Sequence, residues 1–414
     1  MSEIVTVPID SIATGGDGVG RSDGLVVFVP RTAPGDIVNA RISEKRNARF
    51  ARGTLAAIGT ASPDRIEPQC EHYTRDYCGG CQIQHLSYES QLLAKRRIIG
   101  DAVQRIAKRD IASLAPVRPS PKQWRYRTKL TLALRRRGDH WIAGLHRFDD
   151  PARIFPLSDC PITESGVVSV WKEILLAEAL LPDADELRGS VRVAPSGGGA
   201  TFLLHGGLRW PDSEKFLDAV PSLRALWWEP EGGERRLVED RREMSTPAAS
   251  FGQVNPEVAK EMRRHVLERI RSYAPKKVVD GYAGVGDTAA ELAAEGVQVT
   301  AIELDAEASL WSALRLPPPS RALQGRVEKL LGDALPADVV VVNPPRAGLD
   351  AKVSEILQAG ASNLKAVIYV SCDPATLARD LSRLPDFRIA SMQPFDMFPQ
   401  TAHVETVCEL VPAR

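Results

Sequence analysis

Apolar and polar residues alternate along the first 60 positions, in short runs that glycine and proline interrupt. The runs are IVTVPIDSIA, LVVFVP, IVNARISEK and ARGTLAAI, and the glycine-rich segment TGGDGVGRSDG separates the first two. Alternation with a period of two is typical of strands that bury one face, and Pro34 and Gly35 supply a turn. The pattern predicts an OB-like β-barrel of about five strands over residues 1–60.

After residue 250 the pattern changes to helical repeats between short, continuously apolar runs. Helices are predicted at 256–274 and 287–296, and strands at 276–280, 297–303, 337–342 and 366–371. Strands that alternate with helices form a parallel sheet with helices on both faces. We therefore expect residues 251–414 to form a doubly wound α/β domain.

The middle of the chain, residues 61–250, predicts a mixed α+β domain with two basic stretches. Residues 84–109 have helical spacing of the apolar residues Leu92, Leu93, Ile98, Ile99, Val103 and Ile106. Residues 122–137 alternate like a strand from Arg125 to Leu134 and place Trp124 and Tyr126 among cations. Cations suit phosphates and rings can stack on unpaired bases, although an exposed amphipathic element explains either stretch equally well.

Composition narrows the class of protein. The chain has 414 residues, of which 43% are hydrophobic, and 6 cysteines. These figures exclude a disordered chain and a disulfide scaffold. No apolar run approaches the roughly 20 residues of a membrane span, and the N-terminus has no apolar signal segment, so we expect a cytoplasmic protein without a membrane partner.

The net charge of zero hides an asymmetry between the two parts of the chain. Residues 1–160 contain 25 Lys and Arg against 17 Asp and Glu, whereas the remainder contains 28 against 36. A basic N-terminal part favours a polyanionic partner, and we expect nucleic acid.

A glycine-rich loop joins the strand at 276–280 to the helix that follows. Gly281, Gly284 and Gly286 lie in this loop, where glycines permit a tight turn and close approach of a ligand to the helix N-terminus. Glu303 ends the next strand, where a carboxylate can accept hydrogen bonds from both ribose hydroxyls. The pair predicts an adenosine-containing cofactor, although an ordinary glycine turn and an NAD site share the loop pattern.

A prolyl loop favours one of these cofactors. The strand at 337–342 runs directly into Asn343, Pro344, Pro345 and Arg346, at the carboxyl edge where open α/β sheets bind ligands. This loop resembles the substrate-binding loop of S-adenosylmethionine-dependent methyltransferases. We therefore prefer S-adenosylmethionine to NAD.

Two residues near the C-terminus are candidates for catalysis. Cys372 lies between the end of the strand at 366–371 and a helix that Asp373 can cap, and a helix N-terminus lowers a thiol pKa. Glu405 occupies a polar position in an alternating strand that follows His403. A nucleophile and a base are predicted, while a buried structural cysteine and a surface carboxylate remain the alternatives.

Cysteines outside this region form a second candidate site. Cys70, Cys78 and Cys81 lie close together in the sequence, and Cys160 follows after a long gap. In a reducing compartment clustered cysteines more often bind metal than form disulfides, and four thiolates suit either zinc or a 4Fe-4S cluster. Cys408 lies in an apolar strand and is expected to pack in the core.

In this order along the chain, the cysteine set, FGQVN, NPPRAG, SCDPATLARDL and DMFPQTAHVE resemble the RNA uridine-5-methyltransferase family, close to its ribosomal-RNA members. The resemblance spans nearly the whole chain, and the N-terminal barrel resembles a TRAM domain, which binds RNA. It implies a Rossmann-like methyltransferase domain at the C-terminus and a 4Fe-4S cluster on the four cysteines.

The resemblance also implies roles for individual residues. Cys372 would add to C6 of uracil, and Glu405 would remove the C5 proton after methylation. Cofactor contacts would fall on six residues, namely Gln253, Tyr282, Gly284, Asp287, Glu303 and Asn343. The family usually has Asp where this chain has Asn343, so that contact is expected to differ. Arg346 could stabilise the developing enolate oxygen.

The expected substrate is a uridine of 23S ribosomal RNA, and the expected protein is a monomer without an obligate protein partner. Three other interpretations remain: a transfer-RNA uridine-5-methyltransferase, an amino-group N-methyltransferase that uses the loop at 343–346, and a non-catalytic RNA-binding factor. Only the uridine enzymes need the thiol of Cys372.

Overall fold

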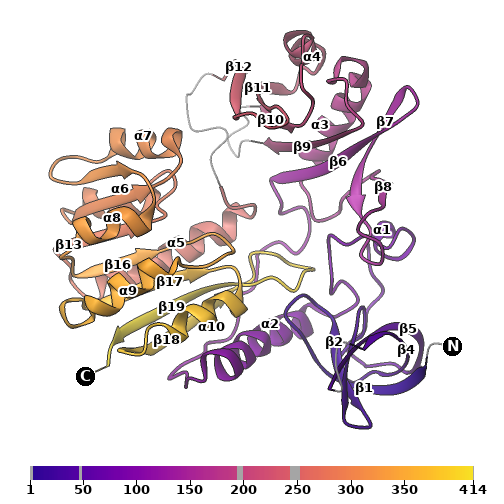
Figure 1. The fold of residues 1–414 in the computed structure, drawn as a ribbon, viewed down its shortest axis with the longest axis horizontal. Coiled ribbons are helices and arrows are strands. Elements are labelled where there is room, and N and C mark those ends of the chain that lie inside the picture. The colour runs from indigo at the N-terminus through magenta and orange to yellow at the C-terminus, as the bar shows by residue number, and fades with distance from the viewer. Residues whose placement is uncertain (1–2, 46–48, 194–198, 243–251, 414) are drawn as a thin grey trace. The chain divides into compact units, whose positions relative to one another are not determined.

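The computed structural model describes residues 3–45, 49–193, 199–242 and 252–413, and the chain divides into two compact units (Figure 1). The first unit comprises residues 1–66, 85–121 and 257–414, and the second comprises 67–84 and 122–256. The predicted central domain at 61–250 is therefore not one unit, because residues 85–121 pack with the C-terminal domain. The predicted boundary after residue 250 lies outside the described residues.

The N-terminal strands form a closed barrel in the order β1-β2-β3-β5-β4, as the alternating pattern predicts. Its inner face carries small and branched apolar side chains, among them Val7, Val27 and Val38, which are fully buried. The strands are β1 (Ile4–Ile12), β2 (Gly18–Ser22), β3 (Leu25–Val29), β4 (Ile37–Lys45) and β5 (Phe50–Thr60).

The second unit contains a seven-stranded sheet in the order β12-β11-β10-β9-β6-β7-β8. Neighbouring strands are antiparallel except β10 and β11. An aromatic core that includes Trp171, Phe202 and Phe216 fills the space between the sheet and its helices. The elements are β6 (Lys129–Arg137), β7 (His140–His146), β8 (Ile154–Pro156), β9 (Glu186–Val193), β10 (Ala200–His205), β11 (Leu223–Glu229), β12 (Arg236–Asp240), α1 (Glu71–Thr74), α3 (Ser165–Leu176), η2 (Glu178–Leu180) and α4 (Ser213–Ala219).

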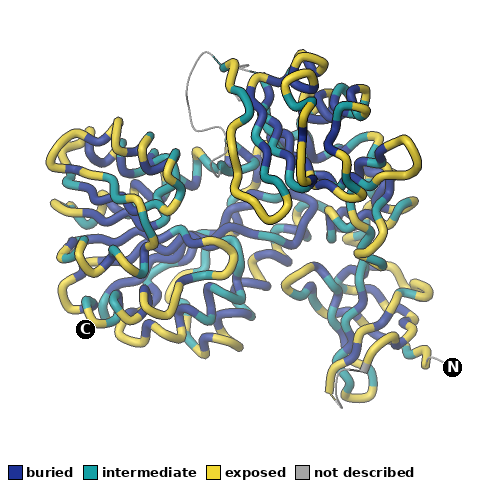
Figure 2. Tube along the Cα trace, turned by 45° about the horizontal axis from the view of Figure 1, so that its top comes forward, coloured by how far each residue is buried: buried dark blue, intermediate teal, exposed yellow. Residues whose placement is uncertain are grey.

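The C-terminal part of the first unit contains a second seven-stranded sheet, in the order β15-β14-β13-β16-β17-β19-β18. The first five strands are parallel, and β19 and β18 continue the sheet antiparallel. The strands are β13 (Lys277–Gly281), β14 (Gln298–Glu303), β15 (Arg321–Gln324), β16 (Val339–Val342), β17 (Ala366–Ser371), β18 (Phe387–Phe395) and β19 (Glu405–Pro412). All residues of β16 and β17 are buried, which explains their continuously apolar sequences (Figure 2).

Helices cover both faces of this sheet, which confirms the predicted doubly wound α/β fold. One hydrophobic core includes residues of α2, α8, α9 and α10, and the other includes residues of α5 and α6. The helices of this unit are α2 (Tyr88–Ala102), η1 (Val103–Ala107), α5 (Pro256–Arg271), α6 (Asp287–Ala294), α7 (Ala306–Arg315), α8 (Val327–Ala334), α9 (Ala351–Ala359), η3 (Ala361–Asn363) and α10 (Pro374–Ser382).

Helix α2 buries a more polar face than its sequence predicts. Leu93 and Ile106 belong to the predicted apolar face, yet they are 67% and 46% exposed. Gln91 and Lys95 are fully buried instead. The Lys95 ammonium donates hydrogen bonds to the Asp396 carboxylate and to the carbonyl of Phe398. At this position, polar contacts therefore stand where the spacing predicted apolar ones.

The described residues contain no helix with both the length and the apolar character needed to cross a membrane.

Candidate active site

Residues from five strands meet at one edge of the C-terminal sheet. β13, β14, β16 and β17 are parallel, so the loops after their carboxyl ends leave the sheet on the same side. β19 runs in the opposite direction, so its first residue lies at that edge too. Open α/β sheets bind ligands at this edge. The topology therefore collects the glycine loop, Glu303, Asn343, Cys372 and Glu405 there.

The ladder between β17 and β19 brings the two catalytic candidates together. Ser371 pairs with Thr406, so the next residues along the two strands are Cys372 and Glu405. Glu405 is only 3% exposed. Burial raises the pKa of its carboxyl to about 7, although the charge of Arg346 opposes the rise. A carboxyl with this pKa can exchange a proton near neutral pH.

The thiol of Cys372 has a raised pKa, which corrects the expectation that the helix N-terminus lowers it. Burial is the largest cause, and the negative charges of Glu405 and Asp373 add to it, so the pKa reaches about 11. The Arg346 charge acts in the opposite direction. The helix start itself is as predicted: Asp373 accepts a hydrogen bond from the Thr376 N–H at 2.8 Å and caps α10. Burial outweighs the helix terminus here.

The glycine loop has the shape of a ligand cradle. Gly284 has φ +56°, and a Cβ built there would meet no atom within 4 Å, so the space beside the loop is open. The Gly284 N–H donates to one carboxylate oxygen of Glu303 at 2.8 Å, and the other oxygen accepts from the Asp305 N–H at 2.8 Å. These residues fit an adenosine cofactor, since the carboxylate and the loop are held beside each other.

Asp280 is an acidic group at this edge that the sequence analysis missed. It lies in β13 directly before the glycine loop and is 4% exposed. Burial raises the pKa of its carboxyl to about 7, and the charge of Glu303 adds to the rise. The signal was visible in the sequence as an acid that ends a buried apolar strand and precedes Gly281. A carboxyl in such a place is a candidate for contact with a bound ligand.

The other predicted cofactor residues have different surroundings. Burial raises the pKa of the Tyr282 hydroxyl, and the negative charges of Glu328, Asp350 and Asp380 add to the rise. The Asp287 carboxylate pairs with Arg263 at 2.7 Å and with Arg315 at 2.9 Å. Both carboxylate oxygens of Asp287 are therefore engaged within the protein.

The backbone N–H of Asn343 donates to the carbonyl of Gly281 at 3.3 Å, which ties the prolyl loop to the glycine loop. Gln253 belongs to the second unit and is half-buried. Their roles toward the cofactor stay predictions.

The four predicted cluster ligands all lie in the second unit, where they are buried free thiols. Burial raises the pKa of Cys81, and the neighbouring thiols of Cys160, Cys78 and Cys70 raise it further. The structure therefore brings together cysteines that lie up to 90 positions apart. Within the described ranges, however, no three His, Cys, Asp or Glu side chains are arranged to hold a metal ion. Cys408, in contrast, is completely buried in the core, as predicted.

Comparisons with known proteins indicate the family of the chain. Residues 2–56 match the TRAM domain, and residues 321–411 match the tRNA (Uracil-5-)-methyltransferase family. An RNA methyltransferase of Halalkalibacterium halodurans is 30% identical, with 99% of this chain and 97% of the relative covered. An RNA methyltransferase of Gloeobacter violaceus is 33% identical over 99% of this chain and 96% of its own length.

A solved structure shares the fold over nearly the whole chain. The tRNA (uracil-54, C5)-methyltransferase of Pyrococcus abyssi, in complex with S-adenosyl-L-homocysteine, superposes with a TM-score of 0.67 at 24% identity, covering 98% of this chain and 100% of that one. This likeness shows the fold, and the family expected from the sequence motifs is confirmed by the family matches together with the two relatives. The chain belongs to the S-adenosylmethionine-dependent RNA (uracil-5-)-methyltransferases.

Proposed function

We propose that this protein methylates C5 of a specific uridine in RNA through a covalent adduct with Cys372. The observation that carries the proposal is the register of β17 and β19, which sets Cys372 beside a buried Glu405 whose pKa is about 7. Arg346 is the cation whose charge reaches both groups. A thiol, a base and a cation at one sheet edge suit addition to a pyrimidine followed by removal of a proton.

Uracil C5 is a poor nucleophile, and covalent catalysis overcomes this. The Cys372 thiolate adds to C6, so that a carbon–sulfur bond forms and the C5–C6 electron pair moves into an enolate between C5 and O4. The positive charge of Arg346 favours the thiolate before addition and the enolate oxygen after it. The activated C5 can then accept a methyl group.

The glycine loop, Asp280 and Glu303 would hold S-adenosylmethionine, which supplies the methyl group when it is bound. Glu405 then takes the proton from C5. The electron pair of that bond re-forms the C5–C6 double bond and expels the sulfur of Cys372 as the thiolate. With a pKa of about 7, Glu405 is both charged enough and basic enough for this step at neutral pH.

For the second unit, we propose that Cys70, Cys78, Cys81 and Cys160 bind a 4Fe-4S cluster. The donor set supports this, because four buried free thiols in one unit suit iron and sulfide. A cluster spreads its ligands over several iron atoms, so its thiols need not converge on one point. Anaerobic reconstitution, with iron and acid-labile sulfide measured in the intact chain and in a Cys81→Ser variant, tests this proposal. Zinc found instead of iron would refute it.

The proposed substrate is a uridine of 23S ribosomal RNA, supported by the likeness of the cysteine set to the ribosomal-RNA members of the family. Transcripts of ribosomal-RNA domains and of transfer RNAs, incubated with the protein and labelled S-adenosylmethionine, distinguish the two substrates. If label appeared in 5-methyluridine of transfer RNA alone, the substrate would be transfer RNA and the proposed ribosomal-RNA substrate would be wrong.

A thiol replacement tests the chemistry. Cys372→Ala is expected to abolish formation of 5-methyluridine, while Cys408→Ala, which removes another buried thiol of the same unit, should retain it. RNA that contains 5-fluorouridine should become covalently attached to the unmodified protein, because fluorine at C5 blocks the final proton removal. Activity of Cys372→Ala on an amino group would indicate an N-methyltransferase. RNA binding without any methyl transfer would indicate a non-catalytic factor.

A further inference from the structure

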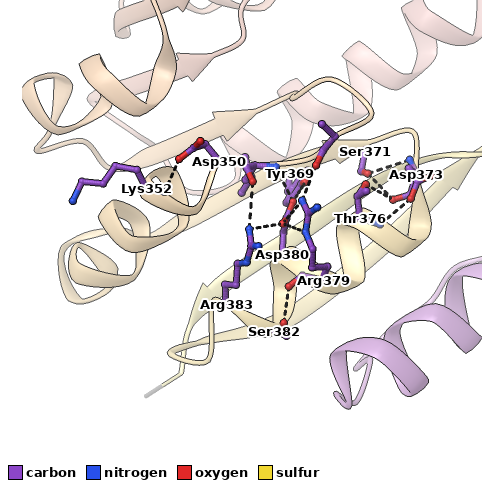
Figure 3. A network of polar contacts seen from close by, with 12 residues as sticks. Asp350, Lys352, Tyr369, Ser371, Asp373, Thr376, Arg379, Asp380, Ser382 and Arg383 are labelled. Atoms are coloured by element: carbon purple, nitrogen blue, oxygen red, sulfur yellow. Dashed lines mark hydrogen bonds and ion pairs between the residues drawn. The ribbon is translucent and has the colours of Figure 1, made fainter.

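Asp380 is a buried carboxylate of helix α10 that joins the two chain segments carrying Cys372 and Arg346. Its side chain is completely buried, although it lies in a helix whose other polar residues are more exposed. Figure 3 shows it between Tyr369, Arg379 and Arg383. A buried carboxylate is costly unless hydrogen bonds and cations satisfy it, so its partners indicate what it does.

One carboxylate oxygen of Asp380 connects a strand with the prolyl loop. Oδ2 accepts hydrogen bonds from the Tyr369 hydroxyl and from the backbone N–H of Leu349, each at 2.7 Å. Tyr369 lies in β17, three residues before Cys372, and Leu349 follows Arg346 by three residues. The same oxygen is therefore hydrogen-bonded both to the strand that precedes Cys372 and to the loop that contains Arg346.

The other oxygen orients two arginines that hold the loop backbone. Oδ1 accepts from Arg379, whose Nη2 is 2.8 Å away, and from Arg383 at 3.3 Å. Arg379 Nη2 also donates to the carbonyl of Ala347 at 2.7 Å, and Arg383 donates to the carbonyl of Leu349 at 3.4 Å. With the Leu349 N–H, three backbone groups of the loop are therefore hydrogen-bonded to side chains of α10 and of Arg383, which follows the helix directly.

The loop sequence is adapted to this contact. Gly348 has φ +79°, which disfavours any residue with a side chain, and a Cβ there would overlap both Asp380 Oδ2 and Arg379 Nη2. The Gly348 N–H also donates to the carbonyl of Pro345 at 2.8 Å, which closes a tight turn around Arg346. Arg346 thus lies in a turn whose following residues, Ala347 and Leu349, are hydrogen-bonded to side chains of α10.

We propose that Asp380 is a positioning residue, which fixes the turn at 345–348 so that the Arg346 guanidinium faces Cys372 and the substrate oxygen. This role rests on the proposed function, and Asp380 itself touches no reacting atom. Its function is to hold an exposed cation at the place where negative charge develops.

The test is the variant Asp380→Asn with the Cys372 thiol pKa as its main readout. That pKa is measured from the pH dependence of Cys372 alkylation by iodoacetamide, followed by mass spectrometry, and needs no turnover. Three charged groups act on the thiol: Glu405, Asp373 and Arg346. Removing the negative charge of Asp380 by itself lowers a thiol pKa, whereas losing the position of Arg346 raises it. The proposal expects the rise.

Turnover gives the second readout. Asp380→Asn is expected to lower kcat on the order of tenfold to a hundredfold while the affinity for S-adenosylhomocysteine stays unchanged, since displacement of a charged group by about 1 Å can cost that much. In an Arg346→Ala background the same substitution should no longer raise the thiol pKa, because only the direct effect of the lost Asp380 charge remains, and that effect lowers it. Gly348→Ala disturbs the contact from the loop side and should reproduce the rise if Asp380→Asn fails to fold.

Glu409→Gln is the matched control. Glu409 is also buried and accepts hydrogen bonds from Tyr273 and Ser391, which both lie outside the loop at 343–349, so its variant should leave the thiol pKa unchanged. A thiol pKa that is unchanged or lowered in both Asp380→Asn and Gly348→Ala overturns the proposal. Failure of the unmodified protein to form 5-methyluridine would instead contradict the proposed function and leave the alkylation result standing.

Discussion

Replacing Glu405 by Gln should make the protein more stable and less active. Glu405 is 3% exposed, and burial is the largest cause of its raised pKa. Above that pKa the folded protein must hold a carboxylate away from water, and the positive charge of Arg346 compensates for this only in part. A neutral amide of nearly the same shape avoids this cost. The proposed base is therefore expected to cost the folded protein stability.

The size of the effect follows from the two pKa values of Glu405. The carboxyl has a pKa of 4.5 as its reference value and about 7 in the folded protein. Between these values the folded protein binds more protons at this site than the unfolded chain, so stability falls as the pH rises. The loss is complete above pH 7 and amounts to about 3 kcal/mol, of which about 2–3 kcal/mol appears between pH 5 and pH 8.

Urea unfolding of the full chain and of Glu405→Gln, at pH 5 and pH 8, measures this difference. The midpoint of the variant should exceed that of the unmodified protein by roughly 1 M more at pH 8 than at pH 5, on an m value of about 3 kcal/mol per molar. Asp280 has a similarly raised pKa, but it is present in both proteins and cancels. Parallel pH dependences of the two proteins would refute the reasoning. Methyl transfer by the variant should fall about 100-fold or more.

Two further substitutions test other parts of the first unit. Lys95→Met removes the cation that pairs with the buried Asp396 carboxylate and should lower the free energy of unfolding by about 3–5 kcal/mol. Adding Asp396→Leu to the same chain should restore most of that loss. A double variant no more stable than Lys95→Met would contradict this. Gly286 has φ +78°, and a Cβ there would overlap Ser312, so Gly286→Ala should weaken the binding of S-adenosylhomocysteine about tenfold, or about 1.4 kcal/mol, by calorimetry. Gly332→Ala is the control and should not weaken it, because its Cβ would meet nothing within 4 Å. Equal affinities of the two variants would exclude a strained loop.

Local patterns were sufficient for the barrel, for the main strands and helices of the C-terminal sheet, and for naming candidate catalytic side chains. Period-two alternation predicted the barrel, and continuous apolar runs between helices predicted the parallel sheet, because burial on one face or on both imposes these patterns directly. The motifs around Cys372 and Glu405 named the candidate thiol and base because the chemistry requires those residue types. The Asp373 cap of α10 is equally local, since its hydrogen bond spans three residues.

Helix α2 shows what such patterns leave open. Its spacing indicated an apolar face that includes Leu93, yet Lys95 and Gln91 are buried because Asp396 and Gln400, about 300 positions away, complete their hydrogen bonds. The domain boundaries differed for the same reason: residues 85–121 pack with the C-terminal sheet rather than with their neighbours in sequence.

The sequence by itself therefore determined the N-terminal barrel, the main strands and helices of the C-terminal sheet, and the candidate thiol and base. Tertiary structure alone decided that Cys372 and Glu405 lie side by side, that burial raises the thiol pKa above its usual range instead of lowering it, and that Asp380 connects the two segments of the site. The physical reason is that pKa values and hydrogen-bond partners depend on the depth of burial and on charges brought in from distant parts of the chain, neither of which a short stretch of residues encodes.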